Sequence, residues 1–185
     1  MKEEIKSPIR HMVQGLAHWM AYRNEMSSIQ LIEADAVFVA TDILRAHLSN
    51  DFVIEREISK KTLPIVKEQR VDVGIKSKSD GSYKCLIEFK LADATNKGLV
   101  GDVEKLSKIK DNHQNATKID CLVVILYRKP CAFTEPECFV NEKGNARKKR
   151  KIEVGEGSVK VRHVCTSFVS STAPKSNKVI CLEVI

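Results

Sequence analysis

The chain has 185 residues, 43% hydrophobic and 30% charged, a composition that can build a core and excludes an intrinsically disordered protein. Its 31 Lys and Arg outnumber 24 Asp and Glu, and the formal charge of +7 favours a polyanionic partner. The opening MKEEIKSPIR lacks the apolar stretch of a signal peptide, and the run CLVVIL is too short to cross a bilayer. We therefore expect a cytoplasmic protein of one domain, with no membrane contact.

Two helices are predicted at the beginning of the chain. The first covers residues 7–23, opens at Ser7-Pro8, and carries apolar residues at helical spacing. The second, within residues 27–48, repeats this pattern and begins with Ser27 or Ser28 as its N-cap. Glu33 lies near the apolar stripe of this second helix, which is an unusual place for a carboxylate.

Strands follow the helices. Residues 51–58 read as a strand, and residues 70–76 and 83–91 read as a hairpin around the turn signal Asp80-Gly81. A helix is predicted at 100–113, followed at 118–127 by a strand that is apolar on both faces, as expected where helices cover both sides of a sheet. The order α-α-β-β-β-α-β predicts an α/β fold with a central mixed sheet flanked by helices.

The last part of the chain, residues 130–185, differs in character. Residues 131–158 mix Pro, Gly and charge, and are predicted to form a long loop. Residues 159–165 and 178–185 are predicted to be two closing strands within the same domain.

Charged residues interrupt the predicted hairpin at Asp72, Glu88 and Lys90. Glu88 and Lys90 lie on one face of their strand, because side chains alternate across a sheet. A three-residue connection, Ser79 to Gly81, would place Asp72 opposite Glu88 on the same face. A two-residue turn would shift the register by one and separate them. We favour the first register, because it leaves these residues on the core side: Val71, Val73, Ile75, Ile87 and Phe89.

Two carboxylates directly opposite each other repel, and a divalent cation would resolve the conflict. Magnesium usually needs only one or two protein carboxylates besides water and phosphate. Lys90 would reach the same site, where it could stabilise charge on a phosphate or help position a water. The alternative is a solvated face on which Lys90 simply neutralises Asp72 and Glu88. The residue types alone leave both interpretations open.

The segments RVDVGI and IEFK, with the element order around them, resemble the PD-(D/E)XK nuclease superfamily over roughly residues 25–127. The resemblance implies a restriction-endonuclease-like core in which Asp72 and Glu88 are metal ligands and Lys90 is the catalytic lysine. Glu33 matches the helix carboxylate that many members add as a further ligand. Val71 stands where the motif's name has proline.

The same resemblance extends to residues near the site and to the reaction. The helix segment GDVEKL would lie beside the site, which makes Asp102 and Lys105 weaker candidates. Glu55 could also reach the site, although an ion-paired sheet edge is the simpler reading. The implied activity is a DNA endonuclease that uses Mg²⁺, with Mn²⁺ as a substitute, of the restriction or phage-defence type. A homodimer would suit the cutting of both strands.

Two other functions stay open. One is a non-catalytic nucleic-acid-binding or assembly module that keeps the fold, and the other is a nuclease specific for RNA or for junctions. The strongest cationic cluster is RKKRK, which would contact nucleic-acid phosphates or form a solvated loop or a nuclear-localisation signal: Arg147, Lys148, Lys149, Arg150 and Lys151. Trp19 and Tyr22 are expected to pack the first helix, and no aromatic platform for single strands is evident.

Overall fold

The computed structural model describes residues 1–25, 32–59, 63, 70–91, 96–112, 119–127, 149–154, 157–169 and 177–185. The helices are α1 (Glu3–Glu25), α2 (Glu33–His47) and α3 (Asn96–Asn112). The strands are β1 (Phe52–Ile58), β2 (Val71–Ser77), β3 (Tyr83–Leu91), β4 (Asp120–Tyr127), β5 (Lys149–Val154), β6 (Gly157–Val169) and β7 (Asn177–Val184). No helix in these described ranges is long and apolar enough to cross a membrane.

The seven strands form one sheet in the order β1-β2-β3-β4-β7-β6-β5. Strands β3 and β4 are parallel, and the other neighbouring pairs are antiparallel. Helix α3 connects the two parallel strands, as a crossover between parallel neighbours requires. The predicted α/β class with a mixed sheet flanked by helices is therefore confirmed.

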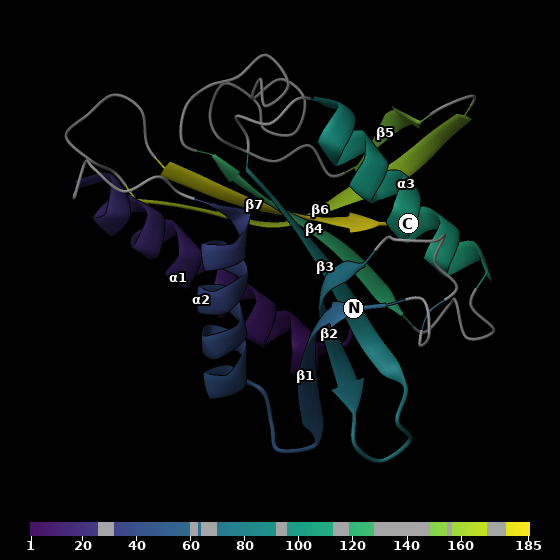
Figure 1. The fold of residues 1–185 in the computed structure, drawn as a ribbon, viewed down its shortest axis with the longest axis horizontal. Helices are drawn as coiled ribbons and strands as arrows, with labels where there is room; N and C mark the ends of the chain where they lie inside the picture. Colours follow the sequence, from purple (N-terminus) through teal and green to yellow (C-terminus); the bar gives the residue numbers. More distant parts are fainter. Residues whose placement is uncertain are drawn as a thin grey trace.

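Helices cover both faces of the sheet. Figure 1 shows α1 and α2 beside each other and α3 apart from them, and the core is correspondingly divided into two clusters. Helix α3 packs Val103, Leu106 and Ile109 against one face, and α1 and α2 pack against the other. Strand β4 is buried on both sides from Cys121 to Leu126, which explains its continuous apolar run.

All three helix starts differ from the sequence prediction. Helix α1 begins at Glu3 rather than Ser7, because Ile5 is buried and the acidic Glu3 and Glu4 suit a helix N-terminus. Pro8 therefore lies inside the helix. Helix α2 begins at Glu33 with no side-chain cap, and the expected caps Ser27 and Ser28 lie outside the described residues. Helix α3 begins four residues earlier than position 100, at Asn96.

The β2–β3 hairpin reaches the predicted register by a different route. The Ser77 N–H donates to Ser82 O at 2.9 Å and the Gly81 N–H donates to Ser77 O at 3.0 Å, so the loop has four residues, 78–81, instead of three. A register shift between Ile75 and Lys76 then restores the expected pairing of Val73 with Ile87. Val71 is buried as predicted, but it joins the cluster on the α3 face and not that of Val73.

Strand β5 was not expected. Residues 149–154 pair antiparallel with β6, with Ile152 opposite Val159, where a loop was predicted. The basic residues at the start of this strand disguise the alternation that would have identified it. Of the basic cluster, Lys149, Arg150 and Lys151 are part of β5, whereas Arg147 and Lys148 lie outside the described residues.

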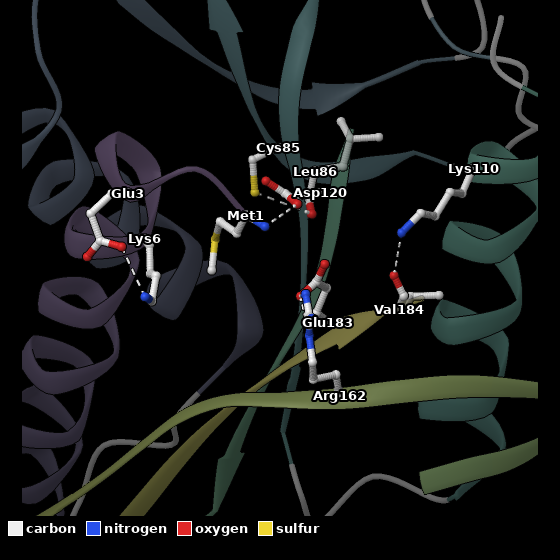
Figure 2. Close-up of polar contacts among 10 residues, drawn as sticks. All are labelled: Met1, Glu3, Lys6, Cys85, Leu86, Lys110, Asp120, Arg162, Glu183 and Val184. Carbon is white, nitrogen blue, oxygen red and sulfur yellow. Dashed lines mark hydrogen bonds and ion pairs between the residues drawn. The ribbon is translucent and has the colours of Figure 1, made fainter. Parts of the chain in front are cut away.

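Several polar contacts gather around the amino-terminal end of β4 (Figure 2). The Met1 ammonium lies 3.2 Å from Asp120 Oδ1, and Lys110 Nζ donates to Val184 O at 2.9 Å. Arg162 Nε donates to Glu183 Oε2 at 3.0 Å across β6 and β7. Asp120 pairs with Cys85 at the start of β3. These contacts therefore lie at the opposite end of the β3–β4 pair from Lys90, which pairs with Ile125.

Candidate active site

Asp72 and Glu88 come from adjacent strands near the carboxyl end of β3. The pairing of Val73 with Ile87 places the next residues, Asp72 and Glu88, opposite each other. Asp72 Oδ2 accepts a hydrogen bond from the Phe89 N–H at 2.8 Å, and Glu88 is only 3% exposed. The pair predicted from the sequence is thus brought together, on a buried face and not a solvated one.

The two carboxyl groups perturb each other's protonation. Burial and the Asp72 carboxylate raise the pKa of Glu88 to about 9, although Lys105 opposes the shift. Burial also raises the pKa of Asp72, against the opposing effect of the Phe89 N–H. With a pKa of about 9, Glu88 keeps its proton at neutral pH in the absence of a metal ion. Such perturbed acids are common at functional sites.

Helix α3 contributes Asp102 and Lys105. Their spacing of three residues puts both on one side of the helix, and Lys105 Nζ lies 3.4 Å from Asp102 Oδ1. Lys105 Nζ also lies 2.7 Å from Glu88 Oε1 and donates to Arg70 O at 2.8 Å. The Lys105 side chain is 10% exposed. Of the two weaker candidates, Lys105 therefore contacts Glu88 directly, whereas Asp102 is connected to the carboxylate pair through Lys105.

Lys90 connects α2 with α3. Its Nζ lies 3.3 Å from Glu33 Oε1 and 3.4 Å from Asp102 Oδ2. The Leu91 N–H donates to Glu33 Oε1 at 3.1 Å, which fixes the first turn of α2 against the end of β3. Burial lowers the pKa of Lys90, but Asp102 and Glu33 outweigh it and the net shift is upward. Lys90 is therefore an ammonium suited to stabilise negative charge, and it is not a base.

These contacts form a chain of alternating charges in the order Glu33, Lys90, Asp102, Lys105 and Glu88, and Asp72 lies beside Glu88. When all four acids are ionised, the two lysines leave an excess of two negative charges. Two buried oxygens, Glu88 Oε1 and Asp102 Oδ2, have no hydrogen-bond partner in the described part of the chain. The lysines near them make ion contacts at 2.7 and 3.4 Å without hydrogen-bond geometry.

A divalent cation fits this imbalance in charge. Among the described residues, however, no three His, Cys, Asp or Glu side chains form a metal-binding group. Glu33 is held by Lys90 and Leu91 instead of standing with the other two proposed ligands. Asp72 and Glu88 would therefore hold Mg²⁺ as a pair, which is within the usual protein contribution for this ion.

An open pocket of about 680 Å³ adjoins the site. Its described lining residues are Glu33, Ala34, Val37, Arg56, Glu57 and Asp72. Glu57 has a φ of 51°, stands between the paired positions Arg56 and Ile58, and forms an ion pair with Arg70. None of Arg56, Glu57 and Arg70 was predicted as a site residue. In the sequence, only the charged residues at the end of β1 indicated that this region could contribute to a site.

Glu55 does not join these residues. Within the described part of the chain, its hydrogen bonds connect it to Lys76, at 3.2 Å, and to the Tyr83 hydroxyl. The Tyr83 hydrogen bond lowers the pKa of Glu55. This arrangement corresponds to the ion-paired edge and not to a site residue.

Comparisons of this chain with protein-family models, with curated proteins and with solved structures found no match.

Proposed function

We propose that this protein is a metal-dependent nuclease that hydrolyses phosphodiester bonds, with a restriction-endonuclease-like core. The observation that carries the proposal is the buried pair of Asp72 and Glu88, which has too little positive charge around it. The order of the elements around the pair supports the same proposal, because the acids lie on the second and third strands and α3 follows. DNA is the substrate we expect first.

Each residue has a role that follows from its position. Asp72 and Glu88 would hold Mg²⁺ or Mn²⁺, and the bound ion supplies positive charge to the scissile phosphate and makes a water more acidic. Lys90 would stabilise the charge that develops on the phosphate, since Glu33 and Asp102 keep it protonated. Asp102 orients both lysines through its two oxygens.

A restriction or phage-defence role, and a homodimer that cuts both strands, are further parts of the proposal. Backbone phosphates would lie against basic residues around the site. The basic start of β5 (Lys149, Arg150 and Lys151) is one candidate contact, because Lys149 pairs with Arg162 of β6 and Lys151 pairs with Lys160.

One observation favours the alternative of a non-catalytic nucleic-acid-binding module. Lys105 already places an ammonium beside Glu88, and a site that neutralises its own charge has less need of a metal. Under this alternative, metal would neither stabilise the protein nor activate it.

The deciding experiment is cleavage of supercoiled plasmid, long linear duplex, single-stranded DNA and RNA, with Mg²⁺, Mn²⁺ or EDTA. Asp72→Asn and Glu88→Gln are the test variants, and Asp111→Asn, an exposed acid on α3, is the matched control. We expect metal-dependent cutting that both test variants lose and the control retains. If no substrate is cut and the Tm does not change when metal is added, the protein is better described as a non-catalytic nucleic-acid-binding module.

A further inference from the structure

The pocket beside the carboxylate pair has a composition that suits one kind of ligand. Its lining includes the acids Asp72 and Glu33 and the apolar side chains of Ala34 and Val37. Apart from Asp72, the charged side chains that line the pocket differ in whether they form an ion pair with another residue of the protein. Glu33 is paired with Lys90, and Glu57 is paired with Arg70.

Arg56 is the exception among these charges. It makes no ion pair with any residue in the described ranges, although Glu55 and Glu57 are its neighbours in sequence, because these bind Lys76 and Arg70 instead. An exposed arginine that lines a pocket and lacks a carboxylate partner is well suited to bind a phosphate.

An exposed aromatic ring stands next to this arginine. Phe38 is 55% exposed, and the Arg56 guanidinium carbon lies 5.7 Å from the centre of its ring. Ala34 lies three residues before Val37 and four before Phe38, so the three lie on one side of α2, where Phe38 meets Arg56 of β1. Stacking of nucleobases on aromatic rings and on arginine is the common way to bind single strands.

We propose that this pocket binds an unpaired nucleotide of single-stranded nucleic acid, with its base against the α2 side formed by Ala34, Val37 and Phe38 and its phosphate on Arg56. The proposal rests on the proposed nuclease activity, because it names the substrate that the same site would cut, and it replaces the duplex of the restriction-type role with a single strand. Because Asp72 lines the pocket, the neighbouring phosphodiester would then lie beside the carboxylate pair.

The size of the pocket favours a single strand over a duplex. Its volume of about 680 Å³ falls within the range of small-molecule sites, about 300–1,000 Å³, which suits one or two nucleotides and not a base-paired helix. A duplex could enter only by opening, at the cost of unstacking its bases. The preferred substrate class is therefore single strands, frayed ends or flaps.

The test measures the binding of fluorescent oligodeoxythymidine, oligouridine and a matched duplex by fluorescence anisotropy. EDTA is present, so that binding is measured without cleavage. Phe38→Ala and Arg56→Gln are the test variants. The controls are Tyr22→Ala, an exposed aromatic on α1, and Arg45→Gln, an exposed arginine on α2 that pairs with Asp42. All four side chains are exposed, so the variants should fold, and equal Tm values would establish this.

We expect the single strands to bind more tightly than the duplex, and each test variant to weaken single-strand binding roughly tenfold, while the controls change it less than about twofold. A difference between the deoxy and ribo probes would tell which single strand fits better. Equal binding of duplex, or no loss in Phe38→Ala, would overturn the inference. If the test variants lose binding but the wild-type protein cleaves no substrate in the metal-dependent assay, the single-strand site is supported and the proposed nuclease activity is contradicted.

Discussion

The ammonium of Lys105 lies 2.7 Å from Glu88 Oε1 and takes the place beside the carboxylate pair that a metal ion would need. Lys105 is anchored there by Arg70 O at 2.8 Å and by Asp102 Oδ1 at 3.4 Å. The protein thus carries its own counter-ion in the site. A metal that binds Glu88 must displace this ammonium or share the carboxylate with it.

Removal of Lys105 should therefore strengthen metal binding. We expect Lys105→Met to bind Mn²⁺ roughly tenfold more tightly than wild type by calorimetry, since no ammonium competes for Glu88. In EDTA the same variant should melt lower than wild type, because the negative charges lose a counter-ion. Lys108→Met is the matched control, as Lys108 pairs with Glu104 on the exposed part of the same helix. Unchanged or weaker metal binding in Lys105→Met would show that Lys105 does not compete.

The stability of the metal-free protein should fall as the pH rises. The folded protein keeps a proton on Glu88 up to a pKa of about 9, whereas the unfolded chain releases it near the ordinary value of 4.5. The folded state thus binds more protons in this window, and the free energy of unfolding decreases with pH. The charges that face Glu88 are Asp72, Asp102 and Lys105.

Glu88→Gln isolates this effect. Thermal unfolding in EDTA should show a flatter dependence of Tm on pH for the variant than for wild type, with a higher Tm for the variant at about pH 8. Each kcal/mol gained would raise the Tm by about 2–4 °C for a domain of this size. Parallel pH curves for the two proteins would argue against a buried proton on Glu88.

Lys90 should matter for cleavage more than for metal binding. We expect Lys90→Met to lower the cleavage rate by roughly 100-fold or more, because one charge that stabilises the transition state is lost. Mn²⁺ binding should change little, since Lys90 contacts Glu33 and Asp102 and not the carboxylate pair. Lys84→Met, on the same strand and paired with Asp80, is the control and should cleave normally. A similar loss in both variants would indicate a general effect of charge.

Two glycines of α3, Gly98 and Gly101, offer a test that separates an effect on helix stability from an effect on the position of the Lys90 side chain. A Cβ on Gly98 would lie 2.7 Å from Lys90 Cε, whereas a Cβ on Gly101 would meet nothing within 4 Å. Replacement of a mid-helix glycine by alanine stabilises a helix by about 0.5–1 kcal/mol. We expect Gly101→Ala to raise the Tm with unchanged cleavage. Gly98→Ala should lower cleavage several-fold, because the flexible end of Lys90 must move. Equal cleavage by the two variants would show that the position of Lys90 is not critical.

Much of the fold could be predicted from the sequence because its signals are local. The buried strand β4 is visible in the sequence as a run of apolar residues. Asp72 and Glu88 are recognisable as charged residues within predicted strands. The register between them was predicted correctly from a loop of the wrong length. The four-residue loop alone would have moved the pairing by one residue, and the irregularity at Ile75 and Lys76 moved it back.

The rest depends on distant contacts that no local pattern encodes. Lys105 was named as a weaker candidate because of its place after the third strand, but its contact with Glu88 arises only when α3 packs on the sheet. The contact of Arg56 with Phe38 joins β1 to α2, so the surface that we propose for base stacking forms only in the folded protein and has no local pattern in the sequence. Strand β5 was missed because its apolar residues follow three basic ones.

The strand order has a consequence for synthesis on the ribosome. Strand β4 is buried from Cys121 to Leu126, yet its second neighbour, β7, follows β5 and β6 in the chain. Until residues 177–184 emerge, β4 has an open apolar edge, and the β5–β6 hairpin has no strand through which to join the sheet. The nascent chain therefore holds this apolar edge unpaired for about 50 residues of elongation, which lasts seconds at typical rates of synthesis. Strand β7 then joins β4 to the β5–β6 hairpin and completes the sheet.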